Sequence, residues 1–151
     1  MNIQSILVLY KQQLAYLTQL LENAKDKKVA LISTRHEAFE VTVHKEEKLL
    51  LQVQETERQR NEVIADFIAR NFPELLGKTT IKLSRILTGK IAPSDLVRLE
   101  GLESELRNII GELKEENSSN LFLIQHMRNF YAETMQALMG KGVTTLLDRK
   151  V

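Results

Sequence analysis

The chain has 151 residues, which is enough for one hydrophobic core but short for two independently packed domains of ordinary size. Its 21 basic and 20 acidic residues leave a net charge of +1, so no overall field favours nucleic acid, an anionic membrane or an acidic substrate. The absence of cysteine excludes disulfides, thiol catalysis and thiolate metal sites, and it is compatible with a reducing compartment.

The amino-terminal residues form a short apolar run, but no basic residue precedes it and no small-residue cleavage signature follows. We therefore do not expect a signal peptide. No apolar run approaches the roughly 20 residues that span a bilayer, so we expect no membrane insertion. Together these features predict a soluble, cytoplasmic protein.

A first long helix is predicted from Ile3 to about Leu31. Its flanks carry few charges, which indicates neighbouring helices on more than one side. The apolar positions alternate in steps of four and three, the spacing of a heptad seam: Ile3, Leu7, Tyr10, Leu14, Leu17, Leu21 and Ala24.

A turn is predicted near residues 32–34, because Thr34 and Glu37 have the spacing of a capping box. In that motif the threonine hydroxyl and the glutamate carboxylate each satisfy an unpaired amide at a helix start. A helix that continues through Lys25 to Arg35 is the alternative.

The second helix is predicted to run to about Arg70, where the residues before Pro73 avoid the helical region and end it. Its length, about 36 residues, makes a rod of roughly 54 Å, whereas a compact domain of this size has a radius of gyration near 15 Å. The predicted fold is therefore all-α: an elongated antiparallel bundle of three long helices with a short extra helix. The seam of the second helix is Leu49, Val53, Thr56, Arg60, Val63 and Phe67.

The stretch between the two prolines predicts a short helix around Thr80 to Leu87, bounded by Gly77 and Gly89. It carries four basic residues and no acid, which is more typical of a solvated face than of a phosphate contact: Lys78, Lys82, Arg85 and Lys90. The triplet at 77–79 matches the end of a phosphate-binding loop, but no strand precedes it, so its amides cannot wrap a phosphate.

The last helix is predicted to start at a cap formed by Ser94 and Asp95 and to keep one register to Ala137. Glu116 and Asn120 then form a polar layer in the seam, of the kind that fixes helix register. We interpret this layer as the border between a segment that builds the core and one that binds a partner. A break at 117–120, with a serine capping a new helix, is the alternative.

After the polar layer the apolar band of this helix widens, and it holds three of the four methionines, whose flexible side chains suit binding surfaces. The alternative is a helix that touches two neighbours within the bundle. The residues predicted to bind a partner are Phe122, Leu123, Met127, Phe130, Tyr131, Met135, Leu138 and Met139.

Gly140 and Gly142 are predicted to end the helix, which gives one bundle domain over residues 1–140 and a flexible tail over 141–151. The apolar residues of this tail, Val143, Leu146 and Leu147, either order on a partner or belong to a frayed terminus.

Residues suited to catalysis or metal binding do not form a recognisable motif. Paired Glu-x-x-His motifs are absent, and Glu40 with His44 is a lone pair more typical of a surface contact. We predict a protein that is not an enzyme and needs no cofactor or metal.

The chain resembles the flagellar export chaperones of the FlgN family over nearly its whole length, although residues 72–92 match poorly. The likeness lies in the order and spacing of short helical patterns: Leu20-Leu21 and Ala30-Leu31, Lys45 to Leu51, Glu57-Arg58, and Asn117 with Asn120, Leu123 and Ile124.

The resemblance implies a cytoplasmic chaperone that binds the hook-associated proteins FlgK and FlgL, keeps them unassembled and presents them to the flagellar export apparatus. It also implies that the client, a helical terminus, is captured near the chaperone's carboxyl end. Nucleic acid is not an expected partner, and monomer and homodimer both stay open. The alternative functions are a generic helical scaffold unrelated to flagella and a nucleotide-binding protein built around Gly77.

Overall fold

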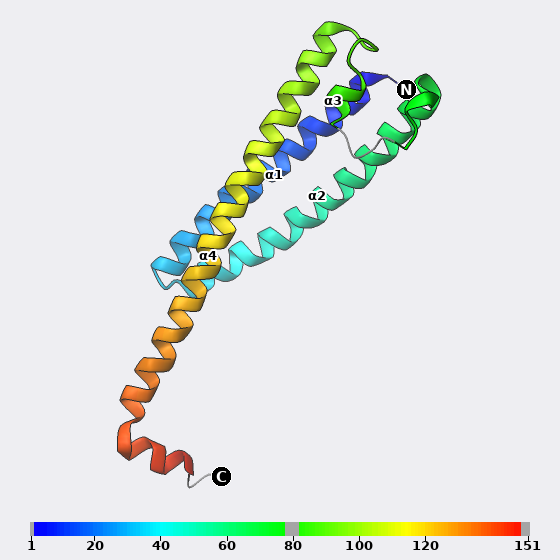
Figure 1. Cartoon of the computed structure of the whole chain (residues 1–151). Coiled ribbons are helices and arrows are strands. Elements are labelled where there is room, and N and C mark those ends of the chain that lie inside the picture. Colours follow the sequence, from blue (N-terminus) through cyan, green and yellow to red (C-terminus); the bar gives the residue numbers. More distant parts are fainter. Residues whose placement is uncertain (1, 78–81, 149–151) are drawn as a thin grey trace.

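The structure, a computed structural model, describes residues 2–77 and 82–148, and the side chains among them up to Met139. Five helical elements follow one another: α1 (Ile3–Ile32), α2 (His36–Asn71), the 3₁₀ turn η1 (Pro73–Leu75), α3 (Leu83–Ile86) and α4 (Pro93–Asp148). The described residues contain no strand. Figure 1 shows an elongated molecule dominated by α1, α2 and α4, so the prediction of an all-α fold with three long helices is confirmed.

Helix α1 occupies the middle of the arrangement, because it packs against both α2 and α4, whereas no comparable packing joins α2 to α4. This confirms the expectation that α1 has neighbours on more than one side. Helix α2 returns antiparallel to α1. Helix α4 runs parallel to α1, since Gln4 bonds to Asp95 near the start of both helices and Ala24 bonds to Asn120 farther along.

The turn between α1 and α2 lies where the sequence predicts it, but the capping box is wrong. Thr34 has a φ of 52°, in the left-handed region, and its hydroxyl donates to the carbonyl of Ser33 instead of accepting from the next helix. Helix α2 starts at His36 after Arg35, which makes no side-chain cap. The turn is closed by backbone bonds instead, including the one from the amide of Arg35 to the carbonyl of Ala30.

The segment after α2 folds over the end of the bundle. Phe72 leaves the helical region before Pro73, as predicted, and its ring packs edge-on against Phe67 at 5.8 Å between centroids. Gly77 and Gly89 both have positive φ, 87° and 73°, and therefore mark chain reversals on either side of α3. Helix α3 is shorter than predicted, four residues from Leu83 to Ile86, and the first two residues of the predicted span, 80–81, lie outside the described residues.

Helix α4 begins at Pro93, so Ser94 and Asp95 lie inside its first turn and are not its cap, in contrast to the prediction. Proline is favoured at the first helical position. The helix accordingly starts there, and the amides of Asp95 and Leu96 both donate to the carbonyl of Ala92. The carboxylate of Asp95 accepts a hydrogen bond of 2.9 Å from the side-chain amide of Gln4 and so joins the starts of α4 and α1.

The hydrophobic core lies in the half of the molecule where α1 begins, α2 ends and α4 begins. Leu87 and Leu99 are fully buried together with Ile6, and Leu106 is the last buried apolar residue of α4 among the side chains described. The seam of α4 therefore stops contributing apolar side chains to the core well before the helix ends.

Candidate functional site

A polar layer crosses all three long helices at the far end of the core. Asn120 is 3% exposed, and its Nδ2 donates 2.8 Å to the carbonyl of Ala24 on α1. Asn23 directly precedes Ala24 in the chain, and its side-chain amide donates a hydrogen bond of 2.8 Å to the carbonyl of Thr42 on α2. The prediction of a polar layer is confirmed, and the alternative of a helix break at 117–120 is wrong, because α4 is continuous there.

An ion pair adds to this layer. Glu116 lies one turn before Asn120 on α4, and its carboxylate lies 3.1 Å from the ammonium group of Lys28 on α1. Since hydrogen bonds from side chains to a given carbonyl form only in one register, the layer fixes how far α4 extends along α1.

Helix α4 extends far beyond the end of α1, which stops at Ile32, eight residues after the Ala24 that bonds to Asn120. At 1.5 Å per residue the 30 residues of α1 make about 45 Å and the 56 residues of α4 about 84 Å, so α4 outruns its neighbour. No side chain from 121 to 139 is buried. Figure 1 shows this part of α4, in orange, continuing alone past the turn between α1 and α2.

The predicted partner-binding residues lie on this projecting segment, and we refer to the eight of them from 122 to 139 as the distal band. Phe122 is 66% exposed, Phe130 60% and Leu138 73%. Tyr131 and Met135 are also exposed, while Leu123, Met127 and Met139 are half-buried. The five exposed residues do not pack within the bundle, so the alternative of contact with two neighbouring helices is wrong for these five.

Aromatic contacts within the distal band are local. The ring of Phe122 stacks on that of His126, one turn along, at 6.1 Å between centroids and an angle of 9°. Phe130 and Tyr131 meet edge to face at 6.1 Å. Because Phe122, Phe130 and Tyr131 are exposed, their outer surfaces are free to pack against another polypeptide.

The end of α4 departs from the prediction. The helix continues to Asp148, so Gly140 and Gly142 do not end it. A helical glycine costs only about 1 kcal/mol relative to alanine, which lowers helix stability without preventing the helix. The side chains of Val143, Leu146 and Leu147 lie outside those described, and the predicted flexibility of residues 141–151 stays a prediction.

One further apolar residue of the projecting segment, Leu121, was not singled out from the sequence although it is 56% exposed. Its neighbour Asn120 is buried, so Asn120 faces the bundle and Leu121 faces solvent. The signal that could have identified Leu121 is the difference in predicted length between the first and last helices.

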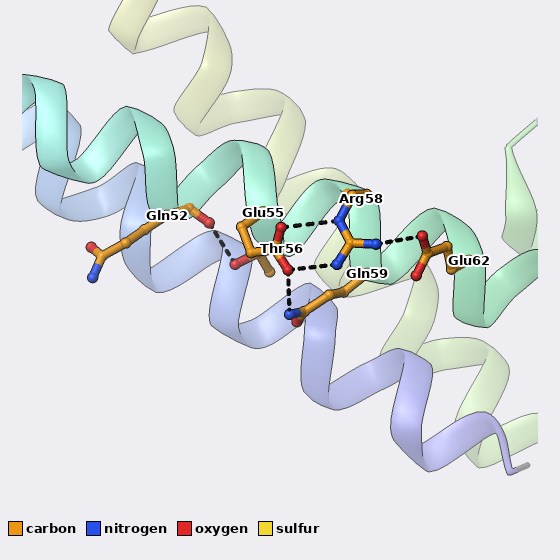
Figure 2. Close-up of polar contacts among 6 residues, drawn as sticks. All are labelled: Gln52, Glu55, Thr56, Arg58, Gln59 and Glu62. Carbon is orange, nitrogen blue, oxygen red and sulfur yellow. Dashed lines mark hydrogen bonds and ion pairs between the residues drawn. The ribbon is translucent and has the colours of Figure 1, made fainter.

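The surface of α2 carries an ionic network at the position of the Glu57-Arg58 pattern. Figure 2 shows Arg58 between two carboxylates: its Nη2 lies 2.7 Å from Glu55 and its Nη1 lies 2.5 Å from Glu62. Gln59 also donates to Glu55, at 2.8 Å. These hydrogen bonds, chiefly the one from Arg58, lower the pKa of Glu55 to about 2. The network lies on the exposed surface of α2 and does not form a binding site.

The other sites considered from the sequence show no built arrangement. Within the part of the chain that the structure describes, no group of three or more His, Asp or Glu side chains could hold a metal ion. His44 lies 3.7 Å from Glu47 on the surface of α2. Of the basic stretch, Lys90 pairs with Glu74 at 2.6 Å, Lys82 and Arg85 are exposed, and Lys78 lies outside the described residues.

Among the described residues, no helix combines the length and the apolarity needed to cross a membrane. The fold and the projecting segment define a helical rod with an unpartnered apolar helix face, an arrangement that suits the binding of another polypeptide.

A family model described as "FlgN protein" matches residues 1–146, and the chain belongs to the FlgN family. The resemblance drawn from the sequence is thus confirmed. Membership supports a role as a flagellar export chaperone in general terms. No curated protein and no solved structure matches the chain.

Proposed function

We propose that this protein is a cytoplasmic, non-enzymatic export chaperone that binds hook-associated proteins of the FlgK and FlgL type through the distal band. It keeps them from assembling prematurely and presents them to the flagellar export apparatus. Membership in the FlgN family supports the general role. The exposure of the distal band is the observation that carries the choice of surface.

The seam of α4 gives the expected mode of binding. In the bundle, the residues of this seam pack against α1, and the same spacing of three and four continues through Leu123, Met127 and Phe130 into the part of α4 that extends beyond α1. An amphipathic client helix can therefore pack along the distal band much as α1 packs along the preceding turns. A client terminus that later packs in a filament has the apolar face that this contact requires.

The exposed area is consistent with reversible binding. Five side chains of the distal band that are roughly half exposed or more offer roughly 100 Å² each, by the usual size of such side chains. Burying roughly 500 Å² contributes about 12 kcal/mol at 25 cal/mol per Å². Association itself opposes binding by about 4–15 kcal/mol, so we expect moderate affinity, as delivery to an export apparatus requires.

Point variants test the proposal with purified FlgK and FlgL homologues from the same organism. Phe130→Ser and Leu138→Ser remove exposed apolar side chains that make no core contact, so the fold should persist while retention of the client falls at least tenfold. Asn129→Ser, an exposed polar position on the same turns, is the matched control. If wild-type protein retains neither homologue, the chain is a generic helical scaffold and the proposal is wrong.

The tail residues Val143, Leu146 and Leu147 extend the proposed client site. Their replacement by serine should weaken client binding further in the Leu138→Ser background. Equilibrium dialysis with labelled ATP tests the alternative of nucleotide binding around Gly77, for which our proposal expects no retention.

A further inference from the structure

A long groove lies between α2 and α4, with α1 as its floor, in the half of the molecule away from the distal band. Its volume is about 910 Å³. Tyr10, Gln13 and Leu17 form the floor, and the residues of η1 and α3 close one end. The lining residues of α2 run from Val53 to Ile68, which corresponds to about 22 Å of helix, or about four turns.

The groove exists because α1 packs against two helices that hardly touch each other. A further helix lying on α1 between α2 and α4 would complete a four-helix arrangement at the usual interaxial distance of about 8–10 Å. Apolar side chains already project toward this space without full cover: Leu76 is 60% exposed and Ile110 is 41% exposed. The shape of the groove thus fits a helix better than a compact small molecule.

The charges along the groove specify the kind of helix. Of its two carboxylates, Glu103 accepts bonds from the backbone amide and the hydroxyl of Ser84, and Glu57 lies 3.9 Å from Arg60. Arg60 also donates to Gln13 and lies over the ring of Tyr10 at 4.9 Å. These three charged groups, Glu57, Arg60 and Glu103, therefore already have partners within the chain.

Two cations on the rim are not engaged. Lys82, which directly precedes α3 at the closed end of the groove, and Arg107 of α4 both line the groove, are exposed and make no ion pair within the described residues. Carboxylates brought to this rim by a bound helix would gain favourable electrostatic contacts with these two cations, whereas a basic helix would be repelled.

The distal segment of a second copy is a poor occupant. Residues 121–139 carry a single acid, Glu133, and a single Arg, Arg128. Leu121, Arg128 and Met135 are spaced seven residues apart, so Arg128 lies in the middle of one apolar line of this helix. Glu133 lies about 140° around the helix axis from Arg128. Docking this apolar line would bring Arg128 against the unpaired cations of the rim.

We propose that this groove is a second docking site, which takes an amphipathic α-helix of a partner protein, about four turns long, with carboxylates along the edge of its apolar face. The apolar face packs on Leu17, Ile64 and Leu106, and the carboxylates meet Lys82 and Arg107. The site is separate from the distal band, so it stands or falls independently of the client site proposed above.

The test uses two synthetic helical peptides of about 18 residues with the same leucine face, one with glutamates flanking that face and the other with lysines. The chain has no cysteine, so single-cysteine variants of the full chain can carry an environment-sensitive fluorophore at a chosen position. Asn61→Cys places the label in the groove, and Gln136→Cys places it on the projecting segment. Titration of each labelled protein then locates the peptide.

The Asn61 label is expected to respond to the glutamate peptide with at least about fivefold higher affinity than to the lysine peptide, the size expected for charges at an interface rim. Arg107→Glu should abolish or reverse that preference. Arg98→Glu, an exposed arginine of α4 that does not line the groove, should leave it unchanged. Phe130→Ser should also leave the Asn61 response unchanged, because it lies in the distal band.

Three results would overturn the proposal. The first is a response of the Gln136 label to the glutamate peptide without any response at Asn61. The second is equal affinity of both peptides for the groove in the wild-type and Arg107→Glu proteins. The third is a response of the Asn61 label to unlabelled protein alone, which would mean that a second copy fills the groove.

Discussion

Replacement of Asn120 by leucine should stabilise the protein, because the polar layer has an incompletely satisfied side chain. Asn120 is 3% exposed, its Nδ2 donates one bond to Ala24, and its Oδ1 has no hydrogen-bond partner in the described structure. Leucine removes a net hydrogen bond of about 1 kcal/mol, but it also removes the penalty of the unsatisfied oxygen, about 1–3 kcal/mol. Its burial adds a further 1.5–3 kcal/mol or so.

The expected sum is a gain of about 2–4 kcal/mol in the free energy of unfolding, which corresponds to a rise in Tm of roughly 5–15 °C for a chain of this size. Urea titration followed by circular dichroism at 222 nm measures this change. Asn117→Leu is the matched control, because Asn117 is exposed three residues earlier on the same helix, and we expect it to stay within about 0.5 kcal/mol of the wild type.

Asn120→Ala separates the contributions, because alanine loses the hydrogen bond and leaves a small cavity without adding apolar burial. We expect it to be destabilised by about 1–2 kcal/mol. If Asn120→Leu is destabilised as much as Asn120→Ala, the hydrogen bond to Ala24 outweighs burial and our reasoning on the layer is refuted. An Asn120→Leu protein that is less stable than the wild type, with α4 in the same register along α1, would also refute it.

Three further measurements test other parts of the structure. Truncation after Leu121 should abolish binding of FlgK and FlgL homologues while the Tm changes by only a few degrees, since no side chain from 121 to 139 is buried; a collapse of the helical signal would contradict this. Arg58→Ala should raise the pKa of Glu55 from about 2 toward its ordinary value, as carboxyl NMR titration can show. Because the folded pKa is the lowered one, the stabilisation by this contact is present above about pH 4.5 and is lost as the pH falls toward 2, and the variant should lack this dependence. Thr34→Gly should stabilise the α1–α2 turn by up to about 1 kcal/mol, because φ is 52° there and a left-handed conformation is unfavourable for threonine; a loss of stability would show that its hydroxyl bond to Ser33 matters more.

The parts of the fold that follow from local patterns could be predicted from the sequence. The seam of α1 from Ile3 onward, the end of α2 before Pro73 and the polar layer at Asn120 all depend on periodicity or on one restricted backbone position. The distal band could be predicted as an unusually wide apolar surface. Whether it was buried or exposed could not, because that depends on where α1 ends relative to α4.

Other features depend on tertiary arrangement or on small energy differences. The spacing of Thr34 and Glu37 matches a capping box, but the turn places Thr34 in a left-handed conformation from which its hydroxyl does not cap α2. Gly140 weakens a helix by an amount too small to predict its end. The groove arises because α1 alone joins α2 to α4, and the heptad pattern of each helix does not reveal how its neighbours divide its surface.

Because no side chain of the projecting segment from 121 to 139 is buried, its exposed residues can change without altering the folding of the rest. Substitutions in this segment should affect the binding of a partner polypeptide much more than the stability of this protein. The segment should therefore be transplantable: exchanging it between members of the family ought to exchange partner preference while each recipient keeps its own melting behaviour.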